Sequence, residues 1–227
     1  MKLVMVRHGE SVWNKENIFT GWMDVELSEK GIEESKRTGE ILKANNFSFD
    51  ICYTSVLKRA IDTMEYIFSE MNISPKVYKD YRLNERHYGA LQGLNKKEIA
   101  NKVGEDQVKR WRRSLKERPP ALSENDDRHP KYNKIFSNIS PDLLPATESL
   151  EDTMKRVVEY YKSKILPQIK KNKKIIIVAH GNSLRALVAY LERLSEQEIL
   201  ELNIPTGVPL IYELDDKYSI INKYYLD

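Results

Sequence analysis

Short apolar runs alternate along this chain of 227 residues with longer stretches whose apolar positions are three or four residues apart. The runs predict β-strands and the spaced positions predict amphipathic helices, because side chains on one face repeat every 2 residues in a strand and about every 3.6 in a helix. We expect strands at residues 3–6, 51–54, 76–78, 174–179, 210–214 and 219–225. We expect helices at residues 28–45, 57–71 and 149–167, after residue 182, and from residue 195.

Serine residues mark the starts of three of these helices. Ser28, Ser149 and Ser195 stand where a hydroxyl would accept from the first free backbone N–H groups. Asp152 and Glu198 follow three residues later and complete two capping boxes. Strands that alternate with helices in this way predict an α/β fold with a mostly parallel central sheet flanked by helices on both faces. We expect residues 1–227 to form a single domain.

The segment from about residue 84 to residue 150 does not follow this alternation. It has two amphipathic helical pieces among polar, proline-rich stretches, at residues 96–103 and 105–116. It contains too few apolar residues for a core of its own, so we expect a helical and loop insertion that covers an edge of the sheet. A flexible linker is the alternative. Trp111, Tyr132 and Phe136 disfavour the linker, because their side chains need a surface to pack on.

Composition excludes several classes of protein. Lys and Arg number 37 against 34 for Asp and Glu, and this balance of +3 does not indicate nucleic-acid binding, although it leaves room for a local cationic pocket. Cys52 is the single cysteine, which excludes an internal disulfide and fits a reducing compartment. No apolar run approaches the ~18 residues of a membrane span, and none resembles a signal peptide. We expect a cytoplasmic protein without nucleic-acid or membrane partners.

Two strand ends repeat one local pattern, VRHGES at residues 6–11 and VAHGNS at residues 178–183. They hold His8 and His180, two of the four histidines, at the ends of parallel strands, where α/β sheets bind ligands. A neutral imidazole can attack phosphorus, and a second, charged imidazole can stabilise the phosphoryl group during transfer. His180 could instead be a core histidine bonded to the sheet. Its matching position favours a second phosphoryl contact.

The residues around His8 suit a phosphate better than a core. Arg7 precedes it, and Gly9 allows a ligand and the backbone to approach closely. Ser11 and Asn14 add a hydroxyl and an amide within one turn. For attack, His8 needs one unprotonated ring nitrogen, and a carbonyl in the Gly9 turn is within reach of the other nitrogen. The pattern predicts a phosphoryl-binding site at this strand end.

Basic residues elsewhere allow two interpretations. Arg59 follows the expected strand at residues 51–54, where a helix start would face the site, but it could instead pair with Asp62 or Thr63. Arg110, Arg112 and Arg113 could form a solvated helix face, which is the more common setting for arginines on helices. Adjacent helical positions point about 100° apart, so both can reach one ligand only if the end of the helix faces the pocket. No group of residues has the spacing of metal ligands, so we expect no metal.

Seven segments, spread from Arg7 to Leu214, together resemble one enzyme family. They are RHGESVWNKENIFTGW, TSVLKRA, LNERHYGALQGLNK, WRRS, DDRHP, AHGNSLRAL and NIPTGVPLIYEL. With them the chain is similar to the cofactor-dependent phosphoglycerate mutases of the histidine phosphatase superfamily. The RHG motif is shared across that superfamily, whereas LNERHYGALQGLNK and the two arginines after Trp111 are more specific to the mutases.

The resemblance implies an isomerase of glycolysis and gluconeogenesis that interconverts 3-phosphoglycerate and 2-phosphoglycerate through a phosphohistidine. It implies His8 as the phosphorylated nucleophile and Glu85 as the proton donor and acceptor, with 2,3-bisphosphoglycerate as the primer of His8. Arg7, Arg59 and His180 would surround the moving phosphoryl group. The implied substrate-binding residues are Arg7, His8, Ser11, Asn14, Thr20, Gly21, Arg59, Glu85, Tyr88, Lys96, Arg112, Arg113, Gly181 and Asn182.

The ligand's charge agrees with this set, and three other functions stay open. A bisphosphoglycerate carries about −4 to −5 charges, and five of these residues are cations. The alternatives are a histidine-type phosphatase and a bisphosphoglycerate mutase or phosphatase on the same fold. Lys96, Arg112 and Arg113, which would hold the far end of the substrate, favour the mutase. A non-catalytic phosphate-binding protein could lose His8 and Glu85, and this chain keeps both. The resemblance also suggests a possible homodimer.

Overall fold

The computed structural model describes residues 1–226, and within that range six strands form one sheet in the order β3-β2-β4-β1-β5-β6. The strands β3, β2, β4 and β1 are parallel to one another, and β5 and β6 continue the sheet antiparallel. The predicted α/β fold with a mostly parallel sheet is therefore confirmed. The strand bounds are β1 Lys2–Arg7, β2 Ile51–Thr54, β3 Lys76–Lys79, β4 Ile175–Ala179, β5 Leu210–Leu214 and β6 Ile220–Tyr225.

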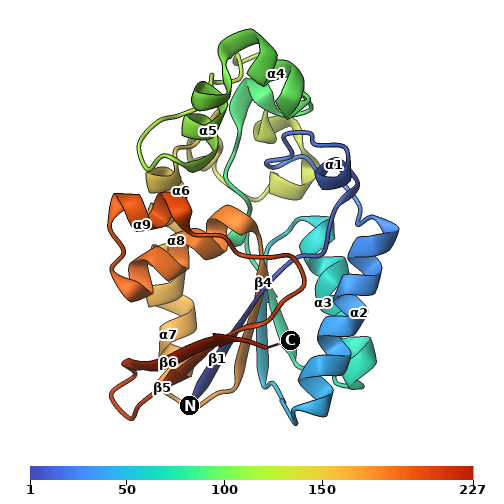
Figure 1. The fold of residues 1–227 in the computed structure, drawn as a ribbon, viewed down its shortest axis with the longest axis vertical. Helices are drawn as coiled ribbons and strands as arrows, with labels where there is room; N and C mark the ends of the chain where they lie inside the picture. Colours follow the sequence, from blue (N-terminus) through green and yellow to red (C-terminus); the bar gives the residue numbers. More distant parts are fainter. Residues whose placement is uncertain (227) are drawn as a thin grey trace.

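Helices cover both faces of the sheet (Figure 1). Side chains alternate between these faces along β1: Val4 and Val6 pack with α2 and α3, and Leu3 and Met5 pack with α6 and α8. Every residue of β4 is buried, as expected for a central strand with helices on both sides. The bounds of the larger helices are α2 Glu29–Ala44, α3 Lys58–Met71, α6 Leu150–Tyr160 and α8 Gly181–Glu192.

The three helix starts predicted from serine residues are correct. The Ser28 hydroxyl caps α2 by accepting from the Gly31 amide, and capping boxes open α6 at Ser149 and α9 (Glu196–Glu201) at Ser195. The helix that begins with α6 continues through a π-helical turn at Tyr161–Ile165 into α7 (Leu166–Ile169). The helix expected after residue 182 begins at Gly181, directly after β4 and His180.

The insertion lies beyond the carboxyl ends of the parallel strands, at the top of Figure 1, rather than along one edge of the sheet. Its apolar side chains pack on residues from outside the segment, such as Phe19 and Trp22, which explains why it needs no core of its own. Phe136 is buried there, but Tyr132 is 53% exposed, so the packing expected for Tyr132 is wrong. The helices of the insertion are α4 Lys96–Val103 and α5 Glu105–Arg113, with 3₁₀ turns at Gly89–Leu91, Pro130–Tyr132, Lys134–Phe136 and Pro141–Leu143.

Two smaller differences from the predicted elements concern the site directly. The helix α5 stops at Arg113 rather than Lys116, because the next residue, Ser114, adopts an extended backbone. A four-residue helix, α1 (Val12–Lys15), follows the first strand and has no counterpart among the predicted elements. A 3₁₀ turn at Tyr81–Leu83 leads from β3 toward the insertion.

None of the described helices combines the length and the apolarity that crossing a bilayer requires.

Candidate active site

Strand pairing brings the two repeated His-Gly turns together. The strands β1 and β4 are parallel neighbours in a register that pairs Val6 with Val178 and Arg7 with Ala179. The next residue on each strand is the histidine, and the His8 amide still donates to the Ala179 carbonyl at 2.9 Å. The imidazole rings of His8 and His180 lie with their centroids 5.0 Å apart. A repeat separated by more than 170 residues of sequence thus becomes one pair of imidazoles at the carboxyl end of the sheet.

The hydrogen bonds of His8 fix its tautomer. Its Nδ1 lies 2.7 Å from the Gly9 carbonyl oxygen, which can only accept, so Nδ1 carries the proton. The Arg59 Nε–H donates to Nε2 at 3.3 Å, so Nε2 carries a lone pair. Burial, followed by the positive charges of Arg59 and Arg7, lowers the pKa of His8 well below its usual value. His8 is therefore a neutral imidazole whose Nε2 is available as a nucleophile.

His180 is completely buried, and its Nε2 lies 2.7 Å from the Ser55 hydroxyl oxygen. Burial, together with the charges of Arg59 and its other neighbours, lowers the pKa of His180 well below its usual value. The ligand-free site therefore favours a neutral His180, and a charged imidazole during phosphoryl transfer stays a prediction. A phosphoryl dianion beside it would have to raise that pKa before His180 could carry a proton on both nitrogens.

The first turn depends on close packing. A Cβ on Gly9 would lie 2.2 Å from the Gly31 carbonyl oxygen, so the turn that follows His8 can hold only a glycine without moving α2. Ser11, by contrast, is fully buried and does not line the pocket. Its hydroxyl accepts from the Asn14 amide and caps α1, while the Asn14 side chain accepts from the Ser11 amide. Ser11 therefore shapes the turn, and Asn14 is the one of the two that reaches the pocket.

Arg59 comes from the first turn of α3 and is 1% exposed. Its guanidinium donates to the carbonyls of Gly21 and Met23 at 2.8 and 2.9 Å as well as to His8. The alternative pairing with Asp62 does not form, because that carboxylate pairs with Lys58. Burial lowers the pKa of Arg59 to about 10, and Glu85 opposes the shift, so the group stays charged at neutral pH.

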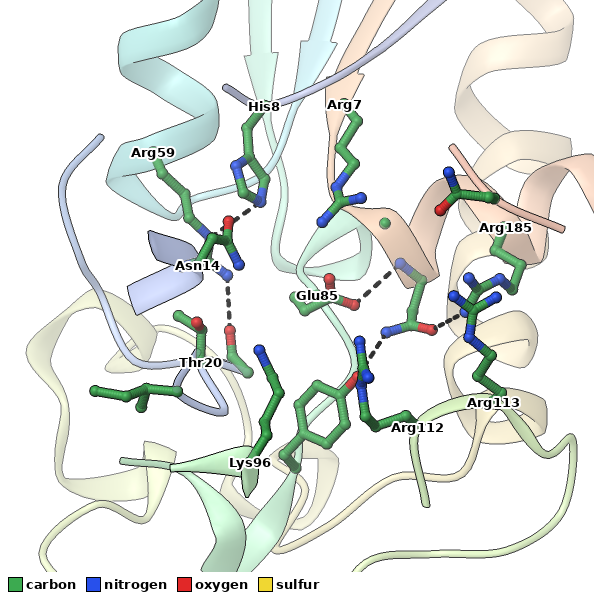
Figure 2. Close-up of a pocket in the computed structure, with 16 residues that line it drawn as sticks. Arg7, His8, Asn14, Thr20, Arg59, Glu85, Lys96, Arg112, Arg113 and Arg185 are labelled. Carbon is green, nitrogen blue, oxygen red and sulfur yellow. Dashed lines mark hydrogen bonds between the residues drawn. The ribbon is translucent and has the colours of Figure 1, made fainter. Parts of the chain in front are cut away.

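The Glu85 carboxylate is held by backbone amides. Its Oε1 accepts from the Arg86 amide at 2.7 Å. The same oxygen accepts from the Asn182 amide, in the first turn of α8, at 3.1 Å, and Figure 2 shows this bond as the dashed line that ends on Glu85. Its backbone carbonyl accepts from the Trp22 indole and from Arg156. Arg82, a close neighbour in the sequence, points elsewhere and pairs with acidic residues outside the site. These two amides hold Oε1, and Oε2 lies on the side of the carboxylate next to Gly181, which lines the pocket.

The basic residues of the insertion reach the same pocket. The helix α5 ends at Arg113, and this end faces the site, so Arg112 and Arg113 both line the pocket despite their different directions. Arg110 on the same helix is exposed and pairs with Glu117. Lys96 opens α4 and is half-buried. Burial and the charge of Arg112 lower its pKa to about 8. The surface interpretation thus applies to Arg110 and not to the two arginines that follow Trp111.

One pocket brings together every residue of the predicted binding set except Ser11, whereas His180 lies buried behind it. Sequence reasoning missed three further lining residues, Ile18, Arg185 and Asn203. The helical spacing offered a signal for one of them, because Arg185 follows Gly181 by four residues and so shares its face of α8. The cations that line the pocket are Arg7, Arg59, Lys96, Arg112, Arg113 and Arg185.

The charge of the pocket defines the ligands that it can take. Six cations face one carboxylate, Glu85, and the ion pairs of residues 1–226 involve none of these six. An anion with several negative charges would replace water around these groups and find preformed donors. No group of three or more potential metal ligands occurs in the part of the chain that the structure describes. The arrangement suits phosphoryl transfer through an imidazole.

Comparison with known proteins agrees with this chemistry. The model of the histidine phosphatase superfamily (branch 1) matches residues 3–128 and 121–226. The chain is 57% identical over 227 residues to a curated 2,3-bisphosphoglycerate-dependent phosphoglycerate mutase of Treponema denticola, and the match covers 100% of this chain and 92% of that protein.

Solved structures share the fold. A mycobacterial glucosyl-3-phosphoglycerate phosphatase superposes with a TM-score of 0.70 at 24% identity, covering 99% of this chain and 96% of the other. A putative alpha-ribazole-5′-P phosphatase of Escherichia coli superposes with a TM-score of 0.72 at 20% identity, covering 100% and 96%. At these identities the likeness supports the α/β fold alone. The family-model match and the full-length relative establish that this chain belongs to the histidine phosphatase superfamily.

Proposed function

We propose that this protein is a 2,3-bisphosphoglycerate-dependent phosphoglycerate mutase, an isomerase that interconverts 3-phosphoglycerate and 2-phosphoglycerate in glycolysis and gluconeogenesis. The observation that carries the proposal is a pocket with a neutral imidazole, a carboxylate and six cations, in a chain that matches the Treponema denticola mutase along its whole length. We also propose that residues 1–227 act as one domain in the cytoplasm, and as a homodimer, which light scattering after gel filtration would test.

His8 carries the phosphoryl group in this proposal. Its Nε2 lone pair forms the P–N bond, while the Gly9 carbonyl keeps the proton on Nδ1 and the ring in place. The Arg59 guanidinium already touches Nε2, and Arg7 lines the pocket beside it. Both cations stabilise the charge on the phosphoryl oxygens during transfer. His180, 5.0 Å away between ring centroids, supplies a further contact and gains a proton only when negative charge lies next to it.

Glu85 moves the proton of the substrate hydroxyl. When that hydroxyl attacks phosphorus and the P–N bond breaks, its proton passes to the Glu85 carboxylate. When the substrate's original phosphoryl group then moves to Nε2 of His8, Glu85 gives the proton to the oxygen that this group leaves. Two backbone amides occupy Oε1, so Oε2, which lies beside Gly181 on the pocket wall, is the oxygen that exchanges the proton. Held from both its side chain and its backbone, this carboxylate needs no reorientation between the two transfers.

The donor set fits 2,3-bisphosphoglycerate. The ligand carries about −4 to −5 charges, and six cations with one carboxylate give the pocket a complementary excess of positive charge. Lys96, Arg112 and Arg113 would hold its end away from His8, and Arg7, Arg59 and Asn14 its end near His8. When bound, the bisphosphate supplies the phosphoryl group that primes His8.

Product analysis distinguishes the mutase from a phosphatase. Phosphorus NMR of the enzyme with 3-phosphoglycerate, in EDTA, should show 2-phosphoglycerate at a rate that rises steeply when bisphosphate primer is added, with little inorganic phosphate. His8→Asn should lose turnover, and Arg110→Gln, on the exposed face of α5, should keep it. Inorganic phosphate as the main product would assign a phosphatase, and loss of turnover in EDTA would refute a mechanism that depends on imidazole and guanidinium groups alone.

A further inference from the structure

Arg185 is one of the six cations of the pocket, and the function proposed above gives it no individual role. It projects from α8, is 7% exposed and lines the pocket together with Arg113 (Figure 2). In Figure 2, Arg113 and Arg185 lie on the opposite side of the pocket from Arg59 and His8, with Glu85 between them. A buried guanidinium at the far end of an anion-binding pocket needs an explanation, because arginine is costly to bury without a charged partner.

Backbone carbonyls hold Arg185 and Arg113 side by side. The Leu202 carbonyl, at the end of α9, accepts from Arg185 Nε and Nη2 at 3.2 and 2.9 Å and from Arg113 Nη1 at 3.4 Å. Arg113 Nη1 also donates to the Leu200 carbonyl at 3.1 Å. The carbonyls at the end of a helix carry partial negative charge and so stabilise two adjacent cations. They are not carboxylates, so both guanidinium groups keep their full positive charge for a ligand.

Arg185 still has hydrogen-bond donors to spare. Of its five N–H groups, two bind Leu202 and one on Nη1 donates to the Asn182 side-chain oxygen at 2.8 Å. Within residues 1–226, one N–H on each terminal nitrogen has no recorded protein acceptor. The ion pairs of the described chain involve arginines such as Arg82 and Arg156, and neither Arg113 nor Arg185. The planar guanidinium fork binds carboxylate and phosphate oxygens in pairs.

We propose that Arg185 is a specificity-determining residue that, with Arg113, binds the second anionic group of the substrate, the one distant from the phosphoryl group at His8. This inference rests on the proposed function, because it assumes a substrate with two anionic ends. The carbonyls of Leu200 and Leu202 hold the two guanidinium groups side by side, where both can bind this second anionic group. A phosphate ester without a second anion gains nothing from Arg185.

Two ligands allow binding at the two ends of the pocket to be measured separately. 3-Phosphoglycerate has a phosphate and a carboxylate, whereas orthovanadate resembles one phosphoryl group under attack and reports on the His8 end alone. Isothermal titration should show that Arg185→Gln raises the Kd of 3-phosphoglycerate roughly 10- to 100-fold, the range for hydrogen bonds to charged groups. The Kd of orthovanadate should change less than about threefold, and Arg110→Gln should change neither. Equal weakening of both ligands would overturn the proposal.

A double-mutant cycle with Asn182→Ala excludes an indirect effect. If Arg185 only orients Asn182, Arg185→Gln will have no further effect in the Asn182→Ala background, and the proposal is wrong. We expect most of the loss to persist. Should Arg185→Gln fail to fold by circular dichroism, Arg185→Lys carries the same test, because one ammonium cannot span Leu202, Asn182 and a ligand. Binding needs no turnover, so absent mutase activity in the wild type would refute the proposed function without deciding the role of Arg185.

Discussion

Lys96 should make the affinity for anionic ligands depend on pH between about pH 7 and pH 9. Burial and the nearby charge of Arg112 lower its pKa to about 8 in the ligand-free pocket. Anion binding should therefore weaken as the pH rises, because Lys96 carries its positive charge below pH 8 and loses it above pH 8. Above pH 8, Lys96 must take up a proton before it can pair with a bound anion. Phosphate esters have a second pKa of about 6, so the ligand's charge stays constant over this range.

The size of the effect follows from a single proton. With a pKa of about 8, Lys96 is about 90% charged at pH 7 and about 10% charged at pH 9, so the Kd of 3-phosphoglycerate should rise about tenfold between them. Arg59 and Arg185, whose pKa values are lowered to about 10, contribute only above this range. Titration calorimetry at pH 9 in two buffers of different ionisation enthalpy should also detect proton uptake on binding.

Two variants identify the group responsible. Lys96→Met should weaken binding at pH 7 about tenfold or more, as expected for losing a hydrogen bond to a charged group, and should flatten the pH profile. Tyr88→Phe is the matched control, because the pKa of Tyr88 is also lowered; its profile should keep the tenfold rise. A flat wild-type profile, or an unchanged slope in Lys96→Met, would refute this account of the pocket's electrostatics.

Three further predictions concern the framework of the site. The side chains of Glu148 and Arg156 form an ion pair and are 5% and 12% exposed, respectively. Glu148→Ala leaves Arg156 without its buried partner and should lower the free energy of unfolding in urea by about 3–5 kcal/mol. A loss below about 1 kcal/mol would contradict the pairing. Gly9→Ala places a Cβ 2.2 Å from the Gly31 carbonyl oxygen and should cost about 1–3 kcal/mol and most of the turnover; an unchanged melting temperature would be inconsistent with that packing. Cys52 is completely buried, which raises the pKa of its thiol, so it should react with a disulfide reagent only as the protein unfolds, and rapid reaction of the native protein would argue against its burial.

The sheet could be predicted because its strands are defined by local patterns. Continuous apolar runs identify strands that are buried on both faces, and serine caps identify helix starts. The predicted strands and capped helices therefore agree closely with those in the structure. The predictions that failed had no local signal in the sequence. Tyr132 is exposed because the insertion packs its other aromatic residues, such as Phe136, on side chains from outside the segment. The early end of α5 at Arg113 has no comparable marker in the sequence.

The site could be predicted in part from the same logic. Two strand-end repeats placed His8 and His180 together, and parallel pairing of β1 with β4 confirms that placement. The roles of Glu85 and of the insertion's cations were predicted only from the family resemblance, because their positions depend on how segments distant in sequence come together. The lowered pKa of His180 could not be predicted either, because it depends on the complete burial of the ring. Arg185 was missed although it shares a face of α8 with Gly181, because the carbonyl that holds it beside Arg113 comes from a segment distant in sequence.

The position of the phosphoryl group on the imidazole tests the central claim most directly. The Gly9 carbonyl holds the proton on Nδ1 of His8, and the lone pair on Nε2 faces Arg59. After brief reaction with labelled 2,3-bisphosphoglycerate and an alkaline quench, mass spectrometry and phosphorus NMR should find one phosphohistidine, at residue 8, with phosphorus on Nε2. A label on Nδ1, on another residue, or nowhere would contradict the account.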